Sequence, residues 1–92
     1  MNEVLLNKLH KYCRNNIEVI EKSKKCFCFY CKSIVDAKEV LDATTPFTRR
    51  IQTAFCPRCD IDSLIPDAIE EEITKEIIDD MYEYWFERIE EN

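Results

Sequence analysis

Apolar residues recur at helical spacing in the first quarter of the chain. Between residues 3 and 21 they occupy every third or fourth position, at Leu5, Leu9, Cys13, Ile17 and Ile20. Polar residues fill most of the positions between them, as in an amphipathic helix that packs one face against a core. We therefore predict a helix over residues 1–22, which ends in the charged stretch that follows.

The middle of the chain consists of short apolar runs without a helical period. Residues 26–31 are rich in Cys and aromatic side chains and are typical of a strand, and residues 51–55 also have β character. Residues 37–43 fit either a short helix or an extended arm. Thr-Thr-Pro then interrupts the chain, and we expect residues 47–50 to form a basic loop.

A second long helical pattern follows Pro66. Asp67 can serve as an N-cap, with Glu70 three residues later, so the pattern predicts a helix over residues 67–91. Its apolar ridge consists of Ile73, Ile77, Met81, Trp85 and Ile89. This helix is predicted to be amphipathic, since acidic residues fill much of its other face.

The composition disfavours most familiar enzyme sites. The chain has 92 residues, which fits one domain, and contains no Gly and one His. It therefore has no Walker A loop, no G-x-G-x-x-G motif and no nucleophile elbow. A single His also disfavours catalytic triads and multi-histidine metal sites. We expect a protein without enzymatic activity.

The six Cys are expected to be reduced. No apolar run approaches the roughly 20 residues of a membrane-spanning helix, and the N-terminus lacks the features of a signal peptide. We therefore expect a cytoplasmic protein without membrane contact. In a reducing compartment, clustered Cys favour metal binding over disulfides.

Four of the six Cys form two C-x2-C pairs, the spacing of zinc knuckles. Cys28 and Cys31 are separated from Cys56 and Cys59 by 24 residues. Two knuckles brought together supply four sulfurs about 2.3 Å from a tetrahedral Zn²⁺. Pro57 also presets the backbone of the second knuckle. The spacing predicts one structural zinc ion, whose filled coordination sphere leaves no position for an activated water.

Other roles for the Cys are less consistent with the sequence. A redox pair or an iron–sulfur cluster would use similar ligands, but neither a thioredoxin-like context nor a ferredoxin spacing is present. Cys26 could replace Cys28 only at a less suitable spacing. His10 and Cys13 could share a helix face as ligands, but a core-facing thiol is the simpler interpretation.

These elements predict a small α+β fold. A zinc-ribbon-like β core with two knuckles would occupy residues 26–62, between the N-terminal helix over 1–22 and the long C-terminal amphipathic helix over 67–91. A core this small often needs additional stabilisation, and the metal would stabilise residues 1–92 as a single domain.

Three segments together resemble a family of small bacterial cytoplasmic proteins. They are C-F-Y-C at 28–31, T-A-F-C-P-R-C-D-I-D-S-L-I at 53–65, and M-x3-W-F at 81–86. The family pattern reads C-F-Y-C, T-A-x-C-P-x-C-G-I-D-S-V and M-x3-W-F. The resemblance implies a paired-knuckle zinc site and no reaction. Asp60 stands where the family has Gly, so the second knuckle would place Asp in a left-handed turn at some strain.

Charge divides the chain into two unlike parts. Within the net charge of −6, residues 1–59 carry +5 and residues 60–92 carry −11. Seven acidic residues fall within about one third of the circumference of the expected C-terminal helix: Glu72, Glu76, Asp79, Asp80, Glu83, Glu87 and Glu90. A solvated face and a surface for a basic partner both fit this pattern.

Two main functions follow from these features. The first is a zinc-binding protein-interaction module or regulator, such as an inhibitor or immunity factor of bacteria or phages. Its partner surface would contain Glu76, Asp80, Glu83, Tyr84, Trp85 and Glu87. The alternative is a nucleic-acid-associated zinc ribbon, although the net charge repels phosphate. That surface would contain Lys24, Lys25, Lys32, Arg49, Arg50 and Arg58. A homodimer also fits the sequence, and a thiol redox enzyme that uses Cys26 is a third function, which the sequence favours least.

Overall fold

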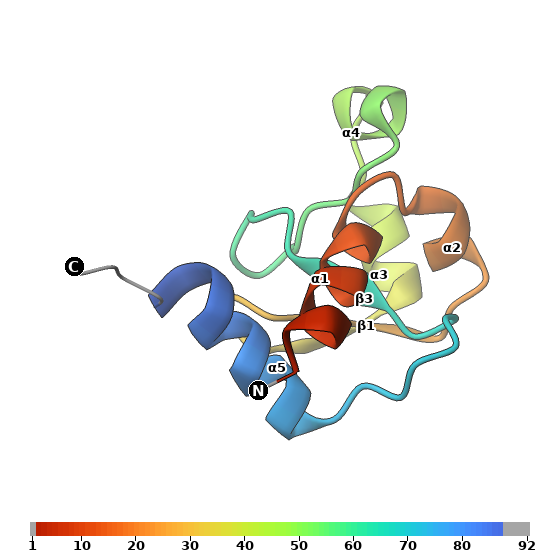
Figure 1. Ribbon diagram of the computed structural model, residues 1–92. Helices are drawn as coiled ribbons and strands as arrows, with labels where there is room; N and C mark the ends of the chain where they lie inside the picture. The colour runs from red at the N-terminus through yellow and green to blue at the C-terminus, as the bar shows by residue number, and fades with distance from the viewer. Residues whose placement is uncertain (1, 88–92) are drawn as a thin grey trace.

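A three-stranded antiparallel sheet lies at the centre of the computed structural model, which describes residues 2–87 (Figure 1). The strand order is β2-β1-β3, so the first strand in the sequence is the central one. Cys26 of the central strand lies opposite Val35 of β2 and Pro66 of β3. The strands are β1 (Lys25–Cys28), β2 (Ile34–Asp36) and β3 (Leu64–Pro66).

Short helices flank this sheet, which confirms the predicted α+β fold with an N-terminal and a C-terminal helix. The α-helices are α1 (Glu3–His10), α2 (Ile17–Glu21), α3 (Ala37–Asp42), α4 (Pro46–Ile51) and α5 (Lys75–Tyr82). A 3-10 turn, η1 (Lys11–Cys13), follows α1, and a π-helical turn, η2 (Glu83–Glu87), follows α5. In Figure 1, α4 projects from the body of the molecule.

The two faces of the sheet carry separate apolar clusters, because successive side chains of a strand point to opposite faces. On one face, Cys26, Cys28 and Leu64 join buried residues of α2 and α3. On the other face, Phe29 and Ile65 join buried residues of α1 and α5. Cys28, at the end of β1, therefore faces away from the N- and C-terminal helices, whereas Phe29 faces toward them.

The predicted helix over residues 1–22 is wrong in its middle. The chain leaves helical geometry after Cys13, and Asn15 has a left-handed φ of 54°. The buried side chain of Asn16 donates to the carbonyl of Tyr12 and accepts from the N–H of Ala54. Asn side chains compete with helical hydrogen bonds in this way, so the helix stops and α2 restarts at Ile17.

The C-terminal helix begins eight residues later than predicted. Thr74 is its N-cap, and its side chain accepts from the N–H of Ile77 at 3.1 Å. Asp67 instead accepts from the N–H of Lys24 and donates its own N–H to the carbonyl of Lys25, so it extends the sheet. The predicted end of the helix at 88–91, including Ile89 of the apolar ridge, lies outside the described residues.

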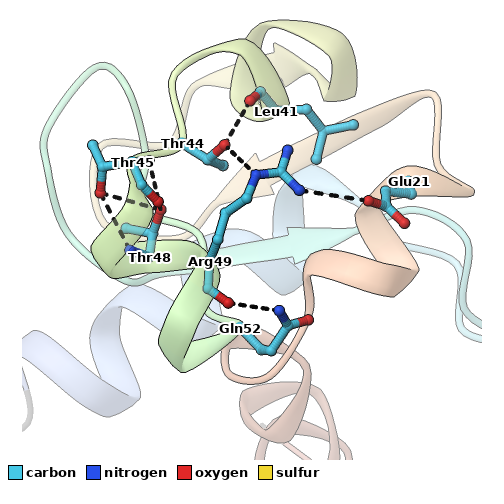
Figure 2. A network of polar contacts seen from close by, with 7 residues as sticks. All are labelled: Glu21, Leu41, Thr44, Thr45, Thr48, Arg49 and Gln52. Carbon is cyan, nitrogen blue, oxygen red and sulfur yellow. Dashed lines mark hydrogen bonds and ion pairs between the residues drawn. The ribbon is translucent and has the colours of Figure 1, made fainter.

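The segment between the two knuckles is more helical than predicted. Residues 37–43 contain α3 rather than an extended arm, and the expected basic loop at 47–50 lies within α4. Thr45 and Thr48 form a reciprocal capping box, shown in Figure 2, with the intervening Pro46 at the start of the helix. The expected β character of 51–55 is also wrong, because Gln52 ends α4 in a left-handed conformation.

Polar contacts hold α4 against the neighbouring helices (Figure 2). The guanidinium of Arg49 donates to Oγ1 of Thr44 at 3.0 Å and lies 3.8 Å from the carboxylate of Glu21. Gln52 donates its side-chain amide to the carbonyl of Arg49 at 2.6 Å. Phe47 and Ile51 of the same helix remain 54% and 40% exposed. Thr48 is the only buried residue of α4, so this helix contributes no buried apolar side chain to the core.

Candidate metal centre

The four Cys of the two C-x2-C pairs form one cluster. Their Sγ atoms all lie within 4.8 Å of one another. Cys28 and Cys59 are 3.6 Å apart, and Cys31 and Cys56 are 3.7 Å apart. Four sulfurs about 2.3 Å from a tetrahedral zinc ion would be separated by about 3.8 Å. The geometry is therefore compatible with one metal ion bound by all four sulfurs.

Each knuckle directs backbone N–H groups at its first sulfur. In the first knuckle (residues 28–32), the N–H groups of Tyr30 and Cys31 both donate to Sγ of Cys28 at 3.4 Å. In the second knuckle (residues 56–60), the N–H of Arg58 donates to Sγ of Cys56 at 3.4 Å. Such bonds stabilise a thiolate, so both turns are arranged to hold charged metal ligands.

Pairing of β1 with the segment before β3 brings the two knuckles together. Cys28 is the last residue of β1, and the N–H of the next residue, Phe29, donates to the carbonyl of Ser63 at 3.1 Å. The second knuckle closes on this segment, because the N–H of Cys56 donates to the carbonyl of Ile61 at 2.9 Å. The central strand and its neighbour therefore place two sequence-distant Cys pairs at one site.

Two serines lie against the sulfurs and were not identified from the sequence. Oγ of Ser63 is 3.0 Å from Sγ of Cys28, and Oγ of Ser33 is 3.3 Å from Sγ of Cys31. Ser33 follows its Cys by two residues, which is a local signal, whereas the contact of Ser63 depends on strand pairing. Both hydroxyls can donate to metal-bound sulfur and support the ligands.

Both knuckles end on a residue with left-handed backbone geometry. The φ angle of Asp60 is 64°, as the sequence predicted for the turn after Cys59. Lys32, which follows Cys31, has a φ of 65°, so the two knuckles share one geometry. Non-glycine residues adopt this conformation at a cost of about 1–2 kcal/mol. The absence of Gly from the chain therefore leaves strain at both turns of the site.

Replacement of Asp60 by Gly is expected to stabilise the protein by about 1 kcal/mol, because Gly adopts a left-handed φ without steric conflict. Asp60 makes no side-chain ion pair among residues 2–87, so little else is lost. Urea unfolding of the zinc-loaded protein measures the change. Asp36→Gly, at an exposed residue with a φ of −61°, is the control and should be destabilising. A loss of stability in Asp60→Gly would contradict this interpretation.

Burial and mutual proximity oppose full ionisation of the four thiols. Burial raises the pKa of Cys56 and the pKa of Cys59, and the neighbouring thiol of Cys28 raises both further. Burial alone would also raise the pKa of Cys31, but hydrogen bonds from Ser33 lower it to about 7. A metal ion that binds all four thiolates must therefore displace protons, so its affinity should fall as the pH falls.

The two remaining Cys belong to the apolar core. Cys26 and Cys13 are buried, and burial raises the pKa of Cys26 to about 12 and the pKa of Cys13 to about 11. Among residues 2–87, His10 and Cys13 belong to no cluster of metal-ligating side chains, and the His10 ring stacks on Trp85 with 4.0 Å between the ring centroids. The interpretation of Cys13 as a core-facing thiol is confirmed, the structure places Cys26 in the core as well, and neither has the low pKa of a reactive thiol.

The predicted protein-binding residues are divided between the surface and the core. Glu76, Glu83 and Glu87 are exposed and Asp80 is half-buried. Tyr84 and Trp85 instead pack against the cluster formed by α1 and α5. Glu72 precedes α5, Asp79 is paired with Lys32, and Glu90 lies outside the described residues. The remaining four acidic residues form the acidic surface, which consists of Glu76, Asp80, Glu83 and Glu87.

Half of the basic residues predicted for nucleic-acid binding are engaged in ion pairs. Lys32 pairs with Asp79, Arg49 with Glu21, and Arg58 with Glu39 at 3.4 Å. The other three basic residues are exposed and make no ion pair within residues 2–87; they are Lys24, Lys25 and Arg50. The positive charge available to phosphate is therefore smaller than the sequence suggested.

Comparisons with known proteins identify no relative. No family model matches the chain, no curated protein matches it significantly, and no solved structure does. The resemblance to small bacterial proteins therefore remains a prediction. In the part of the chain that the structure describes, no helix combines the length and the apolar character needed to cross a membrane. The cluster of four Cys is therefore the main observation from which a function can be inferred.

Proposed function

We propose that this chain is a non-enzymatic protein with one structural Zn²⁺, which binds a basic protein partner through its acidic surface. The observation that supports the metal is the cluster of four sulfurs, all within 4.8 Å of one another. Ligands that are all thiolates favour zinc over magnesium or calcium, which prefer oxygen. Four protein ligands complete a tetrahedral site, so the ion would stabilise the fold rather than activate a substrate.

The acidic surface supports the second part of the proposal. Its four side chains make no ion pair within residues 2–87, although the chain carries 13 basic residues. Like charges on one helix face repel one another, and a basic partner would relieve this repulsion. Because Trp85 is partly buried against the cluster of α1 and α5 and stacks on His10, the acidic side chains rather than this indole would make the contact.

A double charge reversal tests the partner surface. Glu76→Lys with Glu83→Lys should weaken partner binding at least about tenfold, because complementary contacts become repulsive. Tagged wild-type and variant proteins are compared by pull-down from the source cells, and the captured partner is then purified and titrated by calorimetry at two salt concentrations. Wild-type affinity should fall as the salt concentration rises.

A matched variant separates the site from the net charge. Glu3→Lys with Glu18→Lys changes the net charge equally at two exposed residues of α1 and α2. This control should retain the partner. Equal affinity in both double variants would remove the acidic surface from the proposal, and capture of nucleic acid instead of protein would favour the alternative function.

A further inference from the structure

The two residues between Cys28 and Cys31 of the first knuckle contact the C-terminal helix. The ring of Tyr30 lies edge-on to the ring of Phe86 at 4.8 Å between centroids, and it lies 5.9 Å from the ring of Tyr82. The ring of Phe29 points to the same side and lies 5.7 Å from Phe86. Both non-ligand residues inside the first C-x2-C pair therefore pack on α5 and η2.

The residue after the first pair makes contacts to the same helix. Nζ of Lys32 lies 3.0 Å from a carboxylate oxygen of Asp79 and 4.8 Å from the ring centre of Tyr82. The left-handed backbone of Lys32 places this side chain at the end of the knuckle turn. All three non-ligand residues of the first knuckle thus contact α5 or η2.

Within residues 2–87, the non-ligand side chains of the second knuckle make one ion pair and no ring contact. Its intervening residues are Pro57 and Arg58, and Arg58 makes a half-exposed ion pair with Glu39 at 3.4 Å. Such half-exposed pairs contribute little to stability, and this holds for the Lys32–Asp79 pair as well, so the difference between the knuckles depends on the ring contacts. Pro57 lines an open groove of about 380 Å³ together with Phe47 and other residues of α3 and α4. A groove of about 310 Å³ also borders the first knuckle, at Cys28 and Lys32, so the two knuckles differ in the contacts of their non-ligand side chains rather than in the space beside them.

We propose that α5 and η2 form a clamp that keeps the first knuckle closed, so that bound metal leaves by opening of the second knuckle. This inference rests on the proposed zinc site. Metal loss requires the sulfurs to detach in succession, and opening of the first pair would break the ring contacts of Phe29 and Tyr30 and the ion pair of Lys32. Opening of the second pair breaks fewer contacts and is therefore faster.

The clamp can be weakened without removal of core residues. None of the residues of η2 is fully buried, and Phe86 is 39% exposed. Segments with few buried contacts open locally at low cost. Phe86→Ala therefore removes the ring contacts that Phe29 and Tyr30 make to Phe86, while the contact of Tyr30 to Tyr82 and the buried side chains of α5, Ile78 and Met81, remain in place.

Thiol modification during chelation gives the order in which the sulfurs are released. Zinc-loaded full-length protein is mixed with excess chelator and a maleimide, quenched at intervals and mapped by mass spectrometry. Cys56 and Cys59 are expected to react first, and Cys28 and Cys31 later. The buried Cys13 and Cys26 are not ligands, so their modification reports unfolding of the whole chain and should come last.

The variants then test the clamp itself. Phe86→Ala should accelerate modification of Cys28 and Cys31 by about tenfold and leave the rate at the second knuckle within about twofold. Phe47→Ala, an exposed Phe on α4, is the control and should leave the first-knuckle rate unchanged. Simultaneous modification of all six Cys, or earlier modification of the first pair, would overturn the clamp. Absence of stoichiometric zinc before chelation would instead contradict the proposed function.

Discussion

Replacement of Cys59 by Ala is expected to abolish both zinc binding and cooperative folding. A structural zinc ion contributes roughly 10–16 kcal/mol to a small domain, which equals or exceeds the total stability of about 5–15 kcal/mol of most domains. Cys59 is only half-buried, so the loss of its apolar contacts alone would be a small effect. The expected result therefore depends on its role as a ligand rather than on packing.

A buried Cys outside the cluster supplies the control. Cys26 is 0% exposed and lies in the same apolar cluster as Cys28 and Cys56, but it is not among the four clustered sulfurs. Cys26→Ala should retain one zinc ion and lose about 1–3 kcal/mol. Thermal unfolding followed by circular dichroism, with metal content measured on the same samples, separates the two cases. Cooperative, metal-free unfolding of Cys59→Ala at the wild-type temperature would refute the structural role.

The metal site could be predicted because its signal is local. Two C-x2-C pairs specify two tight turns whatever lies between them, and the structure brings both pairs together. The left-handed geometry of Asp60 could also be predicted, because Asp60 directly follows Cys59, the last ligand of the second knuckle. The equivalent geometry at Lys32 was not predicted, because Lys carries no left-handed preference that could reveal it.

The boundaries of the helices depended on partners that are distant in the sequence. Asp67 has the local features of an N-cap, but its carboxylate accepts a hydrogen bond from the N–H of Lys24, which joins Asp67 to the sheet. The break after Cys13 likewise depends on residues about 40 or more positions away. By contrast, the start of α4 had a local signal in Thr45 and Thr48, which departs from the usual Ser/Thr-x-x-Glu capping box.

The C-terminal aromatic residues show why a periodic pattern cannot decide between core and partner. Trp85 was predicted both on the apolar ridge and in the partner surface. The π-helical turn η2 changes the angular spacing of side chains after residue 82, and Trp85 reaches His10 at 4.0 Å. The spacing of apolar residues reveals neither this π-helical turn nor the stacking of Trp85 on His10. The same spacing does predict that Glu76 and Glu83 are exposed.

The break between α1 and α2 leads to the second large expected effect, that of Asn16→Ala. The side chain of Asn16 is 1% exposed and connects three parts of the backbone. Its amide donates to the carbonyl of Tyr12 at 2.9 Å and to the carbonyl of Leu64 at 3.2 Å, and its oxygen accepts from the N–H of Ala54 at 3.1 Å. It thus links the N-terminal helices to β3 and to the approach of the second knuckle.

Asn16→Ala should reduce the stability of the zinc-loaded protein by about 3–5 kcal/mol, because each buried backbone group left without a partner costs about 1–3 kcal/mol. Urea unfolding monitored by the fluorescence of Trp85 measures the loss. Asn7→Ala is the matched control: its side chain donates to the carbonyl of Glu3 at 2.9 Å on an exposed face of α1, where water replaces the lost bond. Similar losses in the two variants would show that burial of Asn16 does not determine its effect, and that the junction it forms contributes little to the fold.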